Sequence, residues 1–205
     1  MTPLDTLSFD KTECRQQWNE LKLLLASAPI LKERKDILPF FKARPDLCSL
    51  ISLYFPKLSE CDCYYNEFPI GDFVADLIVG DRSTCRYVIV EFEDAHSESI
   101  FAVGGRKTPI WAPRLEGAFS QLMDWLWKLD DQRSTKDFLH SFGNASAHFS
   151  GLIVTGKDVK HAPQEIDRLK WRIEKLALNS IPIDIVTFDE LCAATDRWLS
   201  KYYGV

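Results

Sequence analysis

The chain of 205 residues is 46% hydrophobic and 27% charged, a balance that suits one globular fold with a core of ordinary size. Its formal net charge of -5 argues against a protein that coats nucleic acid by charge alone. The sequence contains neither a secretory signal nor an apolar run of the roughly 20 residues that span a bilayer. We therefore expect a cytoplasmic protein that does not contact membranes.

The cysteines do not follow the spacing of a disulfide-rich or zinc-binding domain. One close pair occurs, Cys61 and Cys63, without a second Cys or His pair at zinc-like spacing. The other cysteines are scattered along the chain. We expect all of them to be reduced thiols with structural roles.

The N-terminal part of the sequence is predicted to be helical. One helix is expected from Ser8 to Ala26, because Asp10 can cap it and apolar residues recur at helical spacing behind this cap. A second helical stretch, Lys32 to Phe55, contains Pro39 and Pro45 and should bend or break near them. Its apolar residues are expected to pack against the edge of a sheet.

A β-hairpin is predicted in the middle of the chain. A short strand from Tyr64 to Phe68 comes before two runs that are rich in Val and Ile, Phe73 to Val79 and Tyr87 to Glu93. A polar turn that contains Gly80 and Asp81 joins these two runs.

Three carboxylates interrupt this apolar hairpin. Side chains alternate faces along a strand, so Asp76 lies among apolar positions, and Glu91 and Glu93 share one face of the partner strand. An ionised carboxylate is costly to bury without a partner, and Mg²⁺ prefers carboxylate oxygens. The pattern therefore predicts a divalent-cation site formed by Asp76, Glu91 and Glu93. The alternative is a solvent-exposed edge strand, on which the glutamates would discourage aggregation.

A long irregular segment is expected between Glu93 and Pro113, and such loops are usually functional or mobile. Lys107 in this loop is a candidate for an active-site cation. The clearest helix follows, from Pro113 to Leu129, with apolar residues at three- and four-residue steps. Gln121 lies in the middle of this helix, and its amide can both donate and accept hydrogen bonds at a site. An ordinary polar helix face is the alternative role for this side chain.

The last third of the chain is predicted to alternate strands and helices. We expect a polar, broken segment at 130–149, strands at 149–156 and 181–188, and helices at 163–178 and 189–203, the last capped by Asp189. Buried strands separated by helices indicate parallel pairing, and the preceding hairpin makes the sheet mixed. The predicted fold class is therefore α/β with a restriction-endonuclease-like core. In this core a mixed central sheet is flanked by helices. We divide the chain into an N-terminal helical segment, residues 1–60, and a catalytic unit, residues 61–205.

The acids also match the order and spacing of a known nuclease motif. An acid late in one strand, followed by a Glu-x-acid pair that closes the next strand, resembles the PD-(D/E)xK nuclease site. Asp76 would be the first ligand in that motif and Glu91 the second. Position 93 holds Glu, whereas the motif has Lys there.

A longer stretch of sequence resembles one family within this superfamily. The strings Asn66–Asp76 and Val90–Ala95 are similar to the nuclease domain of Shedu anti-phage defence proteins. Gln121, with the aromatic Trp125 four residues later, matches a helix of that superfamily. The resemblance extends roughly from Asn66 to Val186.

The resemblance implies a metal-dependent DNA endonuclease that binds Mg²⁺ or Mn²⁺ through Asp76 and Glu91, with Glu93 as a further ligand or base. It also implies that Gln121 orients water or substrate and that the chain self-assembles into a homo-oligomer. Because Glu93 replaces the Lys of the motif, two alternatives stay open. One is a catalytically silent nuclease fold that binds nucleic acid or a protein partner, and the other is a small-molecule hydrolase with a carboxylate-bound metal.

Overall fold

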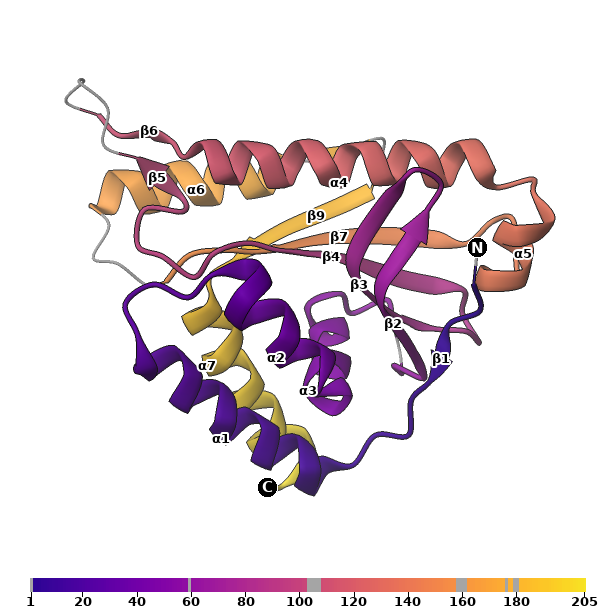
Figure 1. Ribbon diagram of the computed structural model, residues 1–205, viewed down its shortest axis with the longest axis horizontal. Helices are drawn as coiled ribbons and strands as arrows, with labels where there is room; N and C mark the ends of the chain where they lie inside the picture. The colour runs from indigo at the N-terminus through magenta and orange to yellow at the C-terminus, as the bar shows by residue number, and fades with distance from the viewer. Residues whose placement is uncertain (1, 59, 103–107, 158–161, 176, 179–180) are drawn as a thin grey trace.

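The computed structural model describes residues 2–58, 60–102, 108–157, 162–175, 177–178 and 181–205. At its centre is a seven-stranded sheet in the order β1-β2-β3-β4-β7-β9-β8, with helices on both faces (Figure 1). Strands β1 to β4 are antiparallel neighbours, whereas β4, β7 and β9 run parallel to one another. The predicted fold class, an α/β protein with a mixed central sheet flanked by helices, is therefore confirmed.

The elements have the following bounds. The sheet contains β1 (Asp5–Thr6), β2 (Cys63–Ile70), β3 (Phe73–Asp81), β4 (Arg86–Phe92), β7 (His148–Val154), β8 (Ala177–Leu178) and β9 (Ile181–Val186). A separate ribbon pairs β5 (Phe101–Ala102) with β6 (Ile110–Trp111). The α-helices are α1 (Lys11–Ser27), α2 (Leu38–Lys42), α3 (Pro45–Ser49), α4 (Pro113–Gln132), α5 (Lys136–Phe142), α6 (Pro163–Lys175) and α7 (Phe188–Trp198). Short π-helical and 3₁₀ segments are Glu33–Ile37, Leu50–Tyr54 and Leu199–Tyr203.

Helix α4 lies across one face of the sheet (Figure 1). Its apolar side is buried at the expected three- and four-residue steps, and Trp125 is buried with it. These side chains pack on strand residues such as Ile89 and Ile153. Leu122 lies directly over Gly151 of β7, where a Cβ atom would come within 2.5 Å of Leu122 Cδ2. The missing side chain at Gly151 therefore allows α4 to lie close to the sheet.

Helices α1, α2, α3 and α7 cover the opposite face (Figure 1). Phe41 stacks on Phe92 of β4 with ring centroids 4.4 Å apart, and Trp18 donates a hydrogen bond from Nε1 to the carbonyl oxygen of Cys192 at 2.8 Å. The expectation that the N-terminal helices pack against the sheet edge is therefore wrong. The strands alternate buried apolar side chains on both faces, so the second face also needs a helical cover.

Proline and capping chemistry decide where the N-terminal and C-terminal helices begin. The stretch from Lys32 to Phe55 is divided, as expected, and Pro45 starts α3 after a break at Arg44. Helix α7 begins after Thr187, which forms a capping box with Glu190. The predicted cap at Asp189 is wrong, because a Ser/Thr-x-x-Glu box satisfies two backbone N–H groups at the earlier position.

Two further expectations differ from the structure. The segment at 130–149 contains a regular helix, α5, which is capped by Thr135 and was missed because its two turns are too short to show a hydrophobic period. In α6, the helical period places Ile166 on the inward face, but its side chain is 40% exposed. This helix touches the core only through partly buried residues such as Leu169 and Ile173.

All six cysteines are free thiols, as predicted. Burial raises the pKa of the Cys14 thiol to about 12, which favours an inert structural role. Over the ranges that the structure describes, no helix is both long and apolar enough to cross a membrane.

We expect Gly151→Ala to lower the free energy of unfolding by about 1–3 kcal/mol, because the new methyl group overlaps Leu122. Gly117→Ala in helix α4, where a Cβ would meet no atom within 4 Å, is the control and should be neutral or stabilising by up to about 1 kcal/mol. Urea denaturation of the variants measures both effects. Equal unfolding free energies for the two variants would contradict the close approach of α4 to β7.

Candidate active site

The candidate site lies where β3 separates from its neighbours. The ladder between β3 and β4 ends at the pair Leu77 and Val90, one residue before Asp76. Instead of a further backbone pair, the Asp76 carboxylate accepts a hydrogen bond from the Phe92 backbone N–H at 2.8 Å. On the other side, the β2–β3 ladder omits the position of Asp76, where Glu67 has a left-handed φ of 54°. A non-glycine residue with positive φ stores backbone strain of the kind that is common beside functional sites.

Asp76 and Glu91 are brought together by this geometry. Asp76 shares the α4-facing side of β3 with Ile78, and Glu91 shares the same side of β4 with Ile89. The two carboxyl groups are hydrogen-bonded to each other. Glu91 is only 3% exposed, so the pair sits largely out of water. The sequence prediction that these two acids meet on one face is consistent with these contacts.

Burial determines the ionisation of the pair. Burial raises the pKa of Glu91 well above its ordinary value, and the negative charge of Asp76 raises it further. Burial also raises the pKa of Asp76, although the Phe92 N–H and the hydrogen bond from Glu91 oppose this rise. Glu91 therefore keeps a proton at neutral pH and donates it to Asp76.

Gln121 of α4 completes this group. Its side-chain Nε2 donates a hydrogen bond to Glu91 Oε1 at 3.0 Å. Gln121 is itself exposed, so it lies on the solvent side of the buried acids. Asp76, Glu91 and Gln121, three of the residues singled out by the sequence, therefore form one contiguous hydrogen-bonded group.

Glu93 faces a different partner. Strand β4 ends at Phe92, and the Glu93 carboxylate forms an ion pair with Arg114 Nη1 at 2.9 Å. Arg114 lies in the first turn of α4 and also contacts Asp94 Oδ2 through Nη2 at 3.2 Å. Its side chain is about half exposed at 48%, so the guanidinium group borders both the buried acids and solvent.

A second cation lies on the far side of Asp94. Lys32 Nζ contacts Asp94 Oδ2 at 2.8 Å, and the Glu33 backbone N–H donates to Asp94 Oδ1 at 2.9 Å. Burial opposes the ionisation of Asp94, but these hydrogen bonds and the charge of Arg114 hold its pKa below the ordinary value. Burial, and then the charge of Glu93, raise the pKa of Glu33. Negative charge therefore exceeds positive charge around the site.

The donor set fits a divalent cation held by two carboxylates. Among the described residues, no group of three or more His, Cys, Asp or Glu side chains is arranged to hold a metal ion. Asp76 and Glu91 nevertheless place hard oxygen ligands together. The shared proton relieves the repulsion between the two carboxylates, and a bound cation would relieve it in the same way. Mg²⁺ commonly takes one or two protein carboxylates and fills its remaining positions with water and phosphate oxygens.

Other candidates from the sequence lie elsewhere. Asp72, which from the sequence could be a spare ligand or a loop charge, lies in the exposed turn between β2 and β3. Glu67 lies inside β2, and its carboxylate pairs with Lys42. Trp125 is buried in the core and does not line the site. Lys107, the candidate migrated cation, lies outside the described residues.

Sequence reasoning missed Arg114, Asp94 and Lys32 as members of this site. Lys32 belongs to a basic cluster that reads as a solvated helix face, and Arg114 follows a helix-starting proline. For Asp94, the only indication of a role in the site is that it directly follows Glu93 in the sequence. No local sequence pattern predicts that these residues meet. Lys32 and Asp94, for example, are 62 positions apart in the chain.

The fold and site together define an α/β protein in which a mixed sheet carries a buried acid pair beneath a Gln-bearing helix. A sequence model of the family described as Shedu protein SduA, C-terminal, matches residues 31–192. The chain therefore belongs to this family. The match starts within the N-terminal helical segment, well before Asn66, where the resemblance in the motifs begins. None of the curated proteins matches the chain.

We expect the metal-free protein to lose stability as the pH rises above about 4.3, the ordinary pKa of Glu, because the folded state keeps the Glu91 proton that the unfolded state releases. Stability from this proton is complete below the unfolded pKa and is lost by up to about 1.4 kcal/mol per pH unit above it. Glu91→Gln should flatten this slope between about pH 6 and about pH 9.

The measurement is the free energy of unfolding by urea in the presence of a chelator, at several pH values. Glu116→Gln is the control, because the hydrogen bond from Arg172 lowers the pKa of Glu116 and its effect on stability therefore has the opposite sign. An identical slope in Glu91→Gln and wild type would contradict a protonated Glu91.

Proposed function

We propose that this chain is a metal-dependent DNA endonuclease of anti-phage defence that hydrolyses phosphodiester bonds. The observation that carries this proposal is the contact of Asp76 with Glu91 under the amide of Gln121. Membership of the Shedu family supports the defence role and favours a nuclease. Mg²⁺ or Mn²⁺ is the proposed cofactor, because both acids offer hard oxygen ligands.

Each residue of the site has a separate role in the proposed reaction. Asp76 and Glu91 would hold the cation, and Glu91 would release its proton when the cation binds. When bound, the cation would lower the pKa of water and neutralise charge on the phosphate. Gln121 can donate from its amide nitrogen and accept at its amide oxygen, so it would orient the attacking water or a phosphate oxygen.

The positive charge that Lys provides in the nuclease motif must come from another residue here, because position 93 holds Glu. Glu93 cannot supply a positive charge to a phosphate, but it forms an ion pair with the guanidinium of Arg114 and is itself near enough to Asp76 and Glu91 for its charge to raise their pKa values. A guanidinium presents several N–H donors in a plane and binds phosphate oxygens in pairs. We propose that Arg114 supplies the cationic contact and that Glu93 positions Arg114.

The alternative function is a nuclease fold without catalytic activity that binds nucleic acid or a protein partner. The observation that favours it is the engagement of Glu93 with Arg114, which leaves two carboxylates for a metal where the sequence predicted three. In this alternative, the acid pair keeps its proton and Arg114 serves as a plain surface contact.

We expect Asp76→Asn and Glu91→Gln to reduce cleavage of supercoiled and linear DNA in Mn²⁺ to background. The same variants should lose the rise in Tm that Mn²⁺ gives the wild-type protein, because both acids bind the cation. That rise corresponds to roughly 2.7 kcal/mol at a metal concentration of 100 times Kd. Glu116→Gln, which removes a carboxylate outside the site, is the matched control and should keep both properties.

Two results would contradict parts of this proposal. Cleavage at the wild-type rate in both acid variants would refute the site. Metal-dependent stabilisation of the wild type without cleavage of any DNA form would favour the silent binding module.

We expect Arg114→Gln to slow cleavage by about 100-fold, the usual effect of removing one electrostatic contact to a transition state. Glu93→Gln should slow it much less, because Arg114 keeps its charge and its contact with Asp94. Arg172→Gln, which breaks an ion pair with Glu116 away from the site, is the control. Initial cleavage rates at saturating Mn²⁺ distinguish these cases, and a larger loss in Glu93→Gln than in Arg114→Gln would assign Glu93 as a ligand or base.

A further inference from the structure

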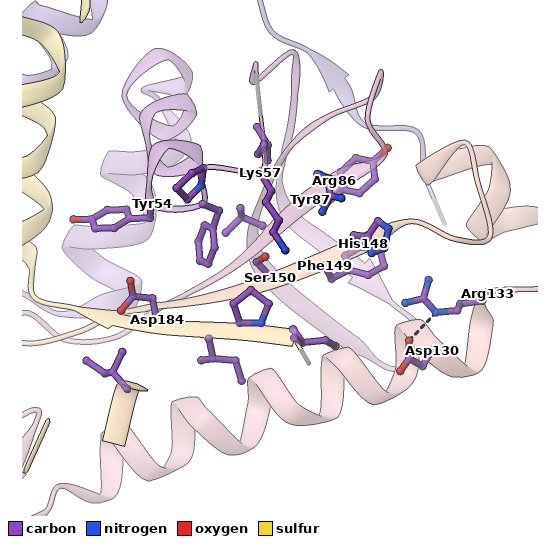
Figure 2. Close-up of a pocket in the computed structure, with 18 residues that line it drawn as sticks. Tyr54, Lys57, Arg86, Tyr87, Asp130, Arg133, His148, Phe149, Ser150 and Asp184 are labelled. Carbon is purple, nitrogen blue, oxygen red and sulfur yellow. Dashed lines mark hydrogen bonds and ion pairs between the residues drawn. The ribbon is translucent and has the colours of Figure 1, made fainter. Parts of the chain in front are cut away.

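A cavity of about 890 Å³ lies beside the first residues of β4 and β7 (Figure 2). The first residues of β4, Arg86 to Val88, line this cavity, and Glu91 lies near the other end of the same strand, so the two sites occupy opposite ends of β4. The volume is within the range of roughly 300–1,000 Å³ that is typical of pockets for small molecules. None of the proposed nuclease residues lines this cavity.

One wall of the cavity is an open strand edge. Strand β9 pairs with β7 only from Gly151 onward, opposite Ile183. The first residues of β7, His148 to Ser150, therefore have no strand partner on that side among the described residues, and they line the cavity. Backbone N–H and C=O groups at such an edge can hydrogen-bond a flat polar ligand.

Positive charge gathers at one side of the cavity. Figure 2 shows Arg86, His148 and Arg133 on this side, with the Lys57 amine reaching toward Ser150. Arg133 is paired with Asp130 at 2.7 Å. Lys57 and Arg86 form no ion pair with any carboxylate in the part of the chain that the structure describes. A protein with a net charge of -5 thus places two cations beside a hollow with no carboxylate partner among the described residues, which favours an anionic ligand.

The other side of the cavity is suited to a ring system. Tyr54 and Asp184 lie there (Figure 2), next to apolar lining from Phe55 and Pro182. The Ile185 backbone N–H donates a hydrogen bond to Asp184 Oδ1 at 2.9 Å, and no described residue donates one to Oδ2. An acceptor beside apolar surface can receive the amino group of a base or the hydroxyl of a ribose.

We propose that this cavity binds a nucleoside phosphate. Its phosphate would lie between Arg86, His148 and Lys57, and its base would lie on the apolar side near Asp184. The cavity is too short for a peptide to add as a strand, because within the described residues just three positions of the β7 edge, His148 to Ser150, lack a strand partner. The same chemistry occurs in a free mononucleotide and in a nucleotide of a DNA strand, so the test must separate these two sources.

The test is isothermal titration of the full chain with AMP, ATP, adenosine, inorganic phosphate and a 5′-phosphorylated trinucleotide. A chelator is present, so the result does not depend on metal binding or on nuclease activity. We expect one site per chain that binds a nucleotide more tightly than adenosine or inorganic phosphate. Tighter binding of the trinucleotide than of AMP and ATP assigns the site to a DNA strand, and the reverse order assigns it to a free nucleotide.

Two variants connect binding to the cavity. Arg86→Gln should weaken nucleotide binding by about 10-fold, as expected for one charge-assisted hydrogen bond. Ser150→Leu keeps the net charge but fills the hollow, and it should weaken binding at least as much. Lys136→Gln removes one exposed positive charge outside the cavity and is the matched control, with no change expected. Circular dichroism confirms that each variant is folded.

Three outcomes would overturn the proposal. The first is the absence of nucleotide binding at millimolar concentration. The second is nucleotide binding that neither Arg86→Gln nor Ser150→Leu weakens. The third is inorganic phosphate binding as tightly as AMP, which would describe a plain anion site.

Discussion

The contact between two carboxyl groups within a largely apolar sheet is the interaction on which the rest of the site depends. Asp76 and Glu91 cannot both be ionised without a compensating positive charge, because burial removes the solvent that would screen them. The nearest donors, the Phe92 N–H and the Gln121 amide, are neutral. The pair must therefore keep a proton or take up a cation. This unmet charge distinguishes the site from a structural ion pair, in which the partner is already present.

Helix α4 connects this charge problem to the packing of the fold. It carries Arg114 in its first turn and Gln121 two turns later, and both side chains contact acids that follow or close β4. The helix is held at this height by Leu122, which lies over Gly151 of β7. A buried helix against a close-packed sheet has few alternative positions, so the contacts of its polar residues are fixed by its apolar ones. The packing of α4 on the sheet therefore also determines the positions of Arg114 and Gln121 at the site.

Charge is also divided between the two ends of the parallel strands. The acidic site lies where β4 ends, whereas Arg86 and His148 lie where β4 and β7 begin. A strand of seven residues separates the two regions, so they do not share residues. The sheet therefore has a buried acid pair at one end and a hollow lined by Arg86 and Lys57 at the other.

The sequence by itself determined the class of fold and the choice of acids for the candidate site. Alternating apolar strands, the helical period of α4, and the acids at Asp76 and Glu91 are local patterns, and periodicity and spacing are enough to read them. Tertiary structure alone decided that Glu93 turns to Arg114, that Lys32 meets Asp94, and that the N-terminal helices cover a whole face of the sheet. These features depend on contacts between segments that are distant in the chain. The pairing of a single charged residue with a distant partner follows no periodic pattern, so the sequence does not reveal it. A buried apolar face does follow such a pattern.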